Sequence, residues 1–118
     1  MFILLRSDLM ATYLGTIDIT PDGFKGIVGN PQNRKEVNEP LFNSLGFEID
    51  HYWYGVGEST IYIVFKAPNN DVDVQALVMA VCASGIVNTM KAVRIIDAAE
   101  GKKAAEKASA IVYSPPGS

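Results

Sequence analysis

Two β-rich runs joined by a short glycine-containing segment lie near the middle of the chain, in His51-Tyr52-Trp53-Tyr54-Gly55-Val56-Gly57-Glu58-Ser59-Thr60-Ile61-Tyr62-Ile63-Val64-Phe65. Gly55 and Gly57 can adopt the positive φ that tight connections require, so the pattern predicts a β-hairpin. The hairpin contains the only His and the only Trp of the chain. We therefore expect it to form the centre of a β-sheet.

Alternating or β-branched runs predict four strands, two of them in the hairpin. The predicted strands span residues 11–20, 47–54, 60–66 and 87–97. Strict alternation along the second strand places four residues on one face and four on the other. The first set is Phe47, Ile49, His51 and Trp53, and the second is Glu48, Asp50, Tyr52 and Tyr54.

A first helix is predicted between the first two strands. Asn30 is a suitable N-cap, with Pro31 at the first helical position, and the helix then runs to about Leu45. Gly46 occupies the position of a C-terminal cap. Pro40 lies inside this helix and lacks an N–H, which predicts a kink or a division into two pieces. A separate helical turn is expected at residues 24–28.

A second helix is predicted from Asn70 or Asp71 to the Ser84-Gly85 break, and a last one over residues 98–109. The second helix is apolar on nearly all sides through residues 79–83, which suggests that its outer side is also covered. We expect residues 1–10 to form a flexible extension and residues 110–118 a flexible tail. One domain over residues 11–109 remains.

The order strand, helix, strand, strand, helix, strand predicts an α+β, ferredoxin-like β-α-β-β-α-β sandwich. Right-handed crossovers place both helices on one face of its antiparallel sheet. The other face carries large side chains and would expose an apolar patch of a size that is rare in soluble monomers. We therefore expect two sheets to pair into a dimeric α/β barrel, with higher oligomers built through the apolar second helix.

Composition excludes several classes of function. The chain has 118 residues, 48% of them apolar, and a net charge of −3, which argues against nucleic-acid binding. One Cys, Cys82, and one His cannot build a typical zinc site, and an unpaired Cys fits the reducing cytoplasm. No apolar run approaches the roughly 20 residues that span a bilayer. Since phosphate-binding loops and nucleophile elbows are also missing from the sequence, we expect no cofactor.

Several short motifs together resemble the GYD-domain family, small bacterial proteins of the dimeric α/β-barrel superfamily. The motifs are Met10-Ala11-Thr12-Tyr13, Ser44-Leu45-Gly46, Tyr52-Trp53, the Gly57 turn, Ala67-Pro68 and Val93-Arg94. The resemblance covers about residues 10–107, but Gly57-Glu58-Ser59 stands in place of the Gly-Tyr-Asp that names the family, and only the glycine carries over. The resemblance implies a fold and an oligomer rather than a reaction.

Three charged or titratable residues are candidates for chemistry. His51 titrates near neutral pH and would suit a general base, although a strand-edge His bonded to backbone or water is the commoner case. Arg94 interrupts an apolar strand, so we expect either a salt bridge, with Asp18, Asp50 or Glu58 as partner, or an anionic ligand. Glu58 lies at the hairpin turn, where carboxylates are usually solvated.

Four aromatic residues, Tyr52, Trp53, Tyr54 and Tyr62, suit either a pocket for a planar ligand or a dimer interface. Asp18 would add a polar group to such a cavity. The favoured interpretation is an oligomeric protein that binds a small aromatic or anionic organic molecule beside the sheet interface. One alternative is a cofactor-independent isomerase or monooxygenase, with His51 as proton shuttle and Asp18 or Glu58 as orienting carboxylate. Another is a purely structural, self-assembling or partner-docking subunit.

Overall fold

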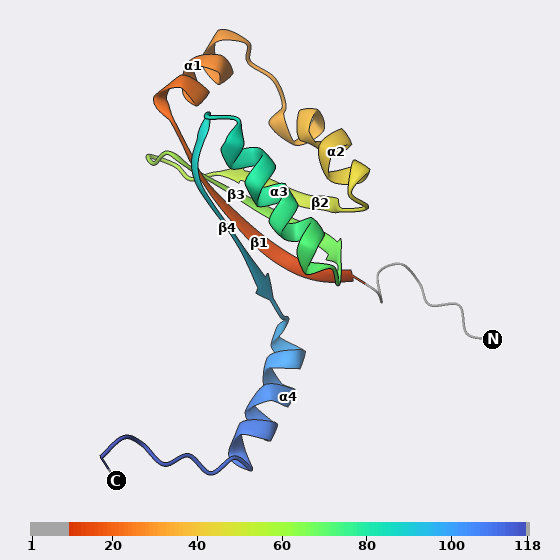
Figure 1. The fold of residues 1–118 in the computed structure, drawn as a ribbon, viewed down its shortest axis with the longest axis vertical. Coiled ribbons are helices and arrows are strands. Elements are labelled where there is room, and N and C mark those ends of the chain that lie inside the picture. Colours follow the sequence, from red (N-terminus) through yellow and green to blue (C-terminus); the bar gives the residue numbers. More distant parts are fainter. Residues whose placement is uncertain (1–9, 118) are drawn as a thin grey trace, which may run out of the picture.

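Four antiparallel strands form a single sheet in the computed structural model, which describes residues 10–117 (Figure 1). The strands are β1 (Met10–Ile19), β2 (Glu48–Tyr54), β3 (Thr60–Pro68) and β4 (Val87–Ile95). Their order in the sheet, β2-β3-β1-β4, is that of a ferredoxin-like fold, so the predicted fold class is confirmed. The hairpin of β2 and β3 does not form the centre of the sheet as expected, because β2 is an edge strand and β1 is the second central strand.

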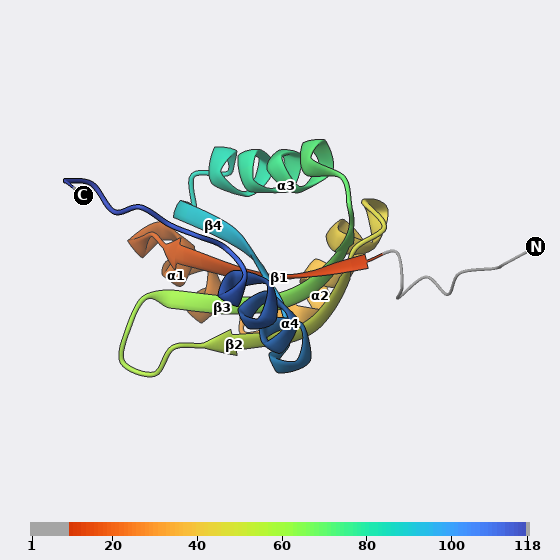
Figure 2. The same cartoon turned by 90° about the horizontal axis from the view of Figure 1, so that it is seen from below.

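Three helices lie on one face of the sheet and a fourth extends away from it (Figures 1 and 2). They are α1 (Pro21–Gly29), α2 (Arg34–Ser44), α3 (Asp71–Ala83) and α4 (Ala98–Ser109). α2 packs against β2 and α3 packs against β4. α4 follows directly after β4 and buries none of its residues.

Two capped helices, α1 and α2, lie between β1 and β2, and the helical turn expected at residues 24–28 is part of α1. Thr20 caps α1, because its Oγ1 accepts a hydrogen bond from the Gly23 N–H at 3.1 Å. Asn33 caps α2 through its Oδ1. The prediction that Asn30 and Pro31 start a helix was wrong, since Asn30 instead ends α1 and Pro31 lies between the two helices.

The other predicted helix boundaries agree with the structure. α2 continues through Pro40 as one helix, without the division that was considered. Gly46 and Gly85 have positive φ, 76° and 80°, and end α2 and α3 as expected. Asn70 caps α3, and α4 has the predicted bounds.

The hydrophobic core lies between the sheet and the three helices. Alternate residues of β1 and β3 point into it, together with Phe42 of α2 and Leu77 of α3. Phe65 of β3 is at its centre, in ring contact with Tyr13, Phe42 and Phe47. Such contacts between rings add to the stabilisation that apolar burial provides.

A β-bulge at Asp50 divides β2. Ile49 pairs with Phe65, but the next paired residue, His51, lies opposite Val64, so one residue of β2 has no partner of its own. A bulge shifts the alternation of side chains by one position. The predicted distribution along β2 is therefore wrong from His51 onward. Tyr52 pairs with the buried Ile63 on the helix side, whereas His51 and Trp53 pair with Val64 and Tyr62 on the opposite side.

The two ends of the described chain differ in structure. The predicted extension over residues 1–10 lies outside the described residues, except for Met10, which begins β1 opposite Pro68. Residues 110–117 contain neither helix nor strand. Within residues 10–117, none of the helices has the length and apolar character needed to cross a bilayer.

Candidate functional site

The face of the sheet that α1, α2 and α3 leave uncovered, here called the open face, carries one set of candidate residues. Strand register assigns its members as Met10, Thr12, Leu14, Thr16, Asp18, Glu48, His51, Trp53, Thr60, Tyr62, Val64, Lys66, Pro68, Thr89, Lys91, Val93 and Ile95. None of them is fully buried. The open face therefore combines apolar, aromatic and polar side chains at a water-exposed surface.

An apolar band crosses the middle of the open face. His51, Val64, Leu14 and Val93 lie side by side across the four strands, in the order of the sheet. Trp53 stacks on His51 with ring centroids 4.6 Å apart and is 54% exposed, while Val93 is 53% exposed. Large apolar side chains in one contiguous band are typical of a surface that another molecule covers.

Two carboxylates, those of Asp18 and Glu58, lie at one end of the open face. Asp18 accepts hydrogen bonds from Ser59 Oγ at 2.7 Å and from Asn88 Nδ2 at 3.4 Å. Glu58 accepts a hydrogen bond from the Tyr62 hydroxyl at 2.5 Å, and this bond raises the pKa of Tyr62 above its usual value. Both carboxylates are thus engaged with groups other than His51. Neither of the two carboxylates suggested as orienting groups is hydrogen-bonded to His51 in the described part of the chain.

The structure brings only part of the predicted site together. His51, Trp53, Tyr62 and Asp18 share the open face, and Glu58 reaches it through Tyr62. The remaining three residues, Tyr52, Tyr54 and Arg94, belong to the helix side by strand register.

Arg94 does not form the salt bridge that was suggested for it. It is exposed near the end of β4 and pairs in register with Tyr13, away from the open face. Of its suggested partners, Asp50 lies 3.5 Å from the Lys66 ammonium, and Asp18 and Glu58 are engaged as described. An exposed guanidinium carries no desolvation cost, so it needs no partner.

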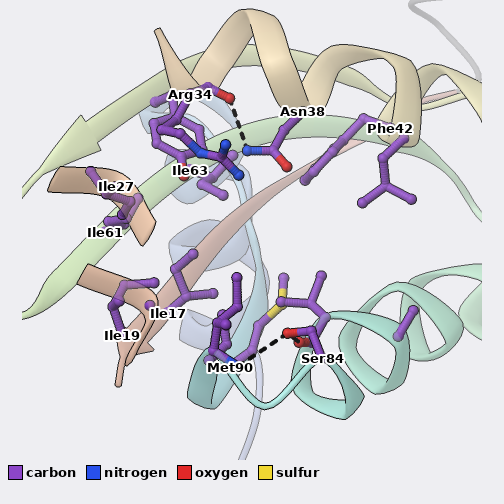
Figure 3. Close-up of a pocket in the computed structure, with 17 residues that line it drawn as sticks. Ile17, Ile19, Ile27, Arg34, Asn38, Phe42, Ile61, Ile63, Ser84 and Met90 are labelled. Atoms are coloured by element: carbon purple, nitrogen blue, oxygen red, sulfur yellow. Dashed lines mark hydrogen bonds between the residues drawn. The ribbon is translucent and has the colours of Figure 1, made fainter. Parts of the chain in front are cut away.

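A second candidate site lies on the helix side, where a cavity of about 300 Å³ separates α1 and α2 from α3 (Figure 3). Its floor is formed by aliphatic side chains of β1 and β3, including Ile17, Ile61 and Ile63. Phe42 and Met90 contribute further apolar walls. The cavity results from tertiary packing, and the sequence patterns did not predict it.

Four polar side chains line this cavity: Arg34, Asn38, Tyr52 and Ser84. Asn38 Nδ2 donates to the Arg34 carbonyl at 2.8 Å, and Ser84 Oγ donates to the Val81 carbonyl at 2.6 Å. Arg34 is half-buried as a residue, and its guanidinium donates to Gln32 Oε1 at 3.3 Å. Arg34 was not among the predicted site residues. A cation in the first turn of a helix is unfavourable because it opposes the helix dipole. This unfavourable placement was the one feature of the sequence that marked Arg34 as unusual.

Replacing Tyr52 with Phe is expected to reduce the loss of stability at alkaline pH. Burial raises the pKa of Tyr52 above its usual value of 10.0; Tyr54 adds to this effect and Arg34 opposes it. The unfolded chain therefore releases this proton at lower pH than the folded chain does. The contribution of Tyr52 to stability is complete below about pH 10 and is lost as the pH rises through the folded-state pKa.

Urea unfolding between about pH 9 and about pH 11 tests this expectation. The free energy of unfolding should fall less steeply with pH in Tyr52→Phe than in the wild type. Tyr113→Phe, which removes a tyrosine that is 75% exposed, is the matched control and should keep the wild-type slope. An equal dependence of unfolding free energy on pH in all three proteins would contradict the raised pKa of Tyr52.

Comparison with known proteins identifies a family for the chain. The family model described as the GYD domain matches residues 13–105, which is most of the chain. No curated protein and no solved structure shows significant similarity to the chain. Among residues 10–117, no group of three or more His, Cys, Asp or Glu side chains could hold a metal ion.

Proposed function

The chain belongs to the GYD-domain family, and we propose that it acts as a homo-oligomer, paired through the open face, that binds a small organic molecule beside this interface. The observation that carries the proposal is the apolar band around Trp53 and Val93, on a face that none of the helices within residues 10–117 covers. Two such faces packed against each other would remove this band from water. Burial contributes roughly 25 cal/mol for each Å² of apolar surface.

The side chains of the open face favour an aromatic ligand over an anionic one. Trp53, Tyr62 and His51 offer flat ring surfaces and polar edges, which suit planar molecules. The cations of this face are Lys66, which already lies beside Asp50, and Lys91 at the edge strand. The unpaired Cys82 supports a reducing compartment such as the cytoplasm as the place of action.

A charge placed in the apolar band tests the proposed pairing. Val93→Asp would bury a carboxylate between two sheets, so we expect the dissociation constant of the oligomer to rise by at least about tenfold. Val56→Asp is the matched control, because Val56 lies in the hairpin turn and is fully exposed. Size-exclusion chromatography with light scattering reports the mass, against 12.8 kDa for one chain.

Trp53 supplies an independent readout, because it is the only Trp of the chain and lies on the open face. Its emission should shift to the blue as protein concentration rises, since pairing removes water from the indole. A wild-type protein of monomer mass at all concentrations, or an unchanged mass for Val93→Asp, would refute the pairing. A small molecule retained with the oligomer in native mass spectrometry would support the ligand, and its absence would favour a purely structural subunit.

A further inference from the structure

We propose that the cavity between α2 and α3 binds a small amphiphilic carboxylate, with its hydrocarbon body on the aliphatic floor and its head group on Arg34. This site lies on the opposite side of the sheet from the open face and does not depend on pairing. Figure 3 shows α2 on one side of the cavity and α3 on the other, with the strands between them.

The first argument is the division of the cavity into apolar and polar parts. Its floor and most of its walls are aliphatic, from Ile17, Ile61, Ile63 and their neighbours. Arg34 and Asn38 lie together on α2, at one side of this floor (Figure 3). Ligand pockets commonly have this composition, with a mainly apolar lining and a few polar groups that orient the ligand.

The second argument is charge. Arg34 is half-buried, and it forms no ion pair with any residue in the described part of the chain. The described residues that line the cavity include no Asp or Glu, so Arg34 provides the only formal charge there. A guanidinium has five N–H donors in a planar fork that matches a carboxylate, and one nitrogen is bonded to Gln32. The Tyr52 hydroxyl also interacts with this guanidinium. The fork still has N–H donors that can donate to both oxygens of a carboxylate.

The third argument is size. A volume of about 300 Å³ lies at the lower end of the range for ligand pockets. A water molecule takes about 30 Å³ of liquid, so the cavity has room for on the order of ten non-hydrogen atoms. An eight-carbon fatty acid has this size. The cavity therefore fits a medium-chain carboxylate rather than a nucleotide or a long lipid.

Octanoate is a suitable probe, with 1-octanol and octylamine as neutral and cationic analogues of similar length. Isothermal titration of the full chain should show saturable binding of octanoate, weaker binding of octanol and the weakest binding of octylamine. Arg34→Gln should weaken octanoate binding about tenfold, as expected for the loss of a charge-assisted hydrogen bond, and should leave octanol binding unchanged. The matched control is Lys35→Gln, which removes a neighbouring cation that is paired with Glu39 outside the cavity.

The location of the probe separates this site from the open face. Amide signals of Ile17, Ile61 and Ile63 in NMR spectra should shift on addition of octanoate, while the indole signal of Trp53 should stay in place. Equal affinity of octanoate for Arg34→Gln and Lys35→Gln would overturn the proposal, as would equal binding of octylamine. A response at Trp53 alone would also overturn it, since it would place the probe on the open face.

Discussion

Replacing Phe65 with Ala is expected to lower the free energy of unfolding by about 3–5 kcal/mol, the usual cost of truncating a buried Phe. Phe65 is 0% exposed and lies on a central strand. Its ring is 5.5 Å from that of Tyr13, 5.3 Å from that of Phe42 and 5.8 Å from that of Phe47. The substitution would leave a cavity bordered by rings from β1, α2 and the segment before β2, and these cannot all move inward to fill it.

Chemical denaturation with the midpoint and slope measured together checks this result. Tyr113→Ala is the matched control, because it truncates an aromatic side chain that is 75% exposed in the tail. The control should change stability by no more than about 0.5 kcal/mol. A loss below about 1 kcal/mol for Phe65→Ala would show that the ring cluster is not the centre of the core.

Gly23→Ala is expected to destabilise the fold by about 1–3 kcal/mol, although alanine is the better helix former. Gly23 is the one buried residue of α1. A Cβ at this position would lie 2.6 Å from the Ile86 carbonyl oxygen and 2.7 Å from Ile19 Cγ2. The Ile86 carbonyl cannot move freely, because it accepts hydrogen bonds from both the N–H and the hydroxyl of Thr20, each at 3.0 Å.

Gly26 in the same helix provides the control, since a Cβ there meets no atom within 4 Å. Gly26→Ala should stabilise the protein by about 0.5–1 kcal/mol through helix propensity. The two substitutions are chemically identical and three residues apart, so thermal unfolding should give shifts of opposite sign. A gain in stability from both would show that α1 does not pack against the segment before β4.

Local signals made much of the fold predictable. Alternating and β-branched runs identified the four strands, and their order identified the topology. Asn70 begins α3, Gly85 ends it and Gly46 ends α2. These ends are predictable because helix caps form hydrogen bonds with residues close in sequence. The start of α2 was harder to predict than the break that precedes it. Asn30 and Asn33 are both good caps by type, and the choice between them depends on how α1 packs.

The candidate site was less predictable because it depends on tertiary structure. Hydrophobic alternation cannot reveal the bulge at Asp50, since the extra residue is polar and fits the pattern as well as any other. Tyr52 and Trp53 were therefore assigned to the wrong faces. The cavity beside Arg34 arises from the separation of α2 and α3, which no local pattern encodes.

The bulge at Asp50 also determines how the aromatic residues of β2 are divided. His51 and Trp53 belong to the open face only because one extra residue precedes them, and for the same reason Tyr52 belongs to the cavity. A one-residue shift in a strand exchanges its two faces. Loss or gain of a single codon at this edge strand would therefore send Trp53 inward and Tyr52 outward. Such a change would alter the open face and the cavity on the helix side together, without replacing any aromatic residue.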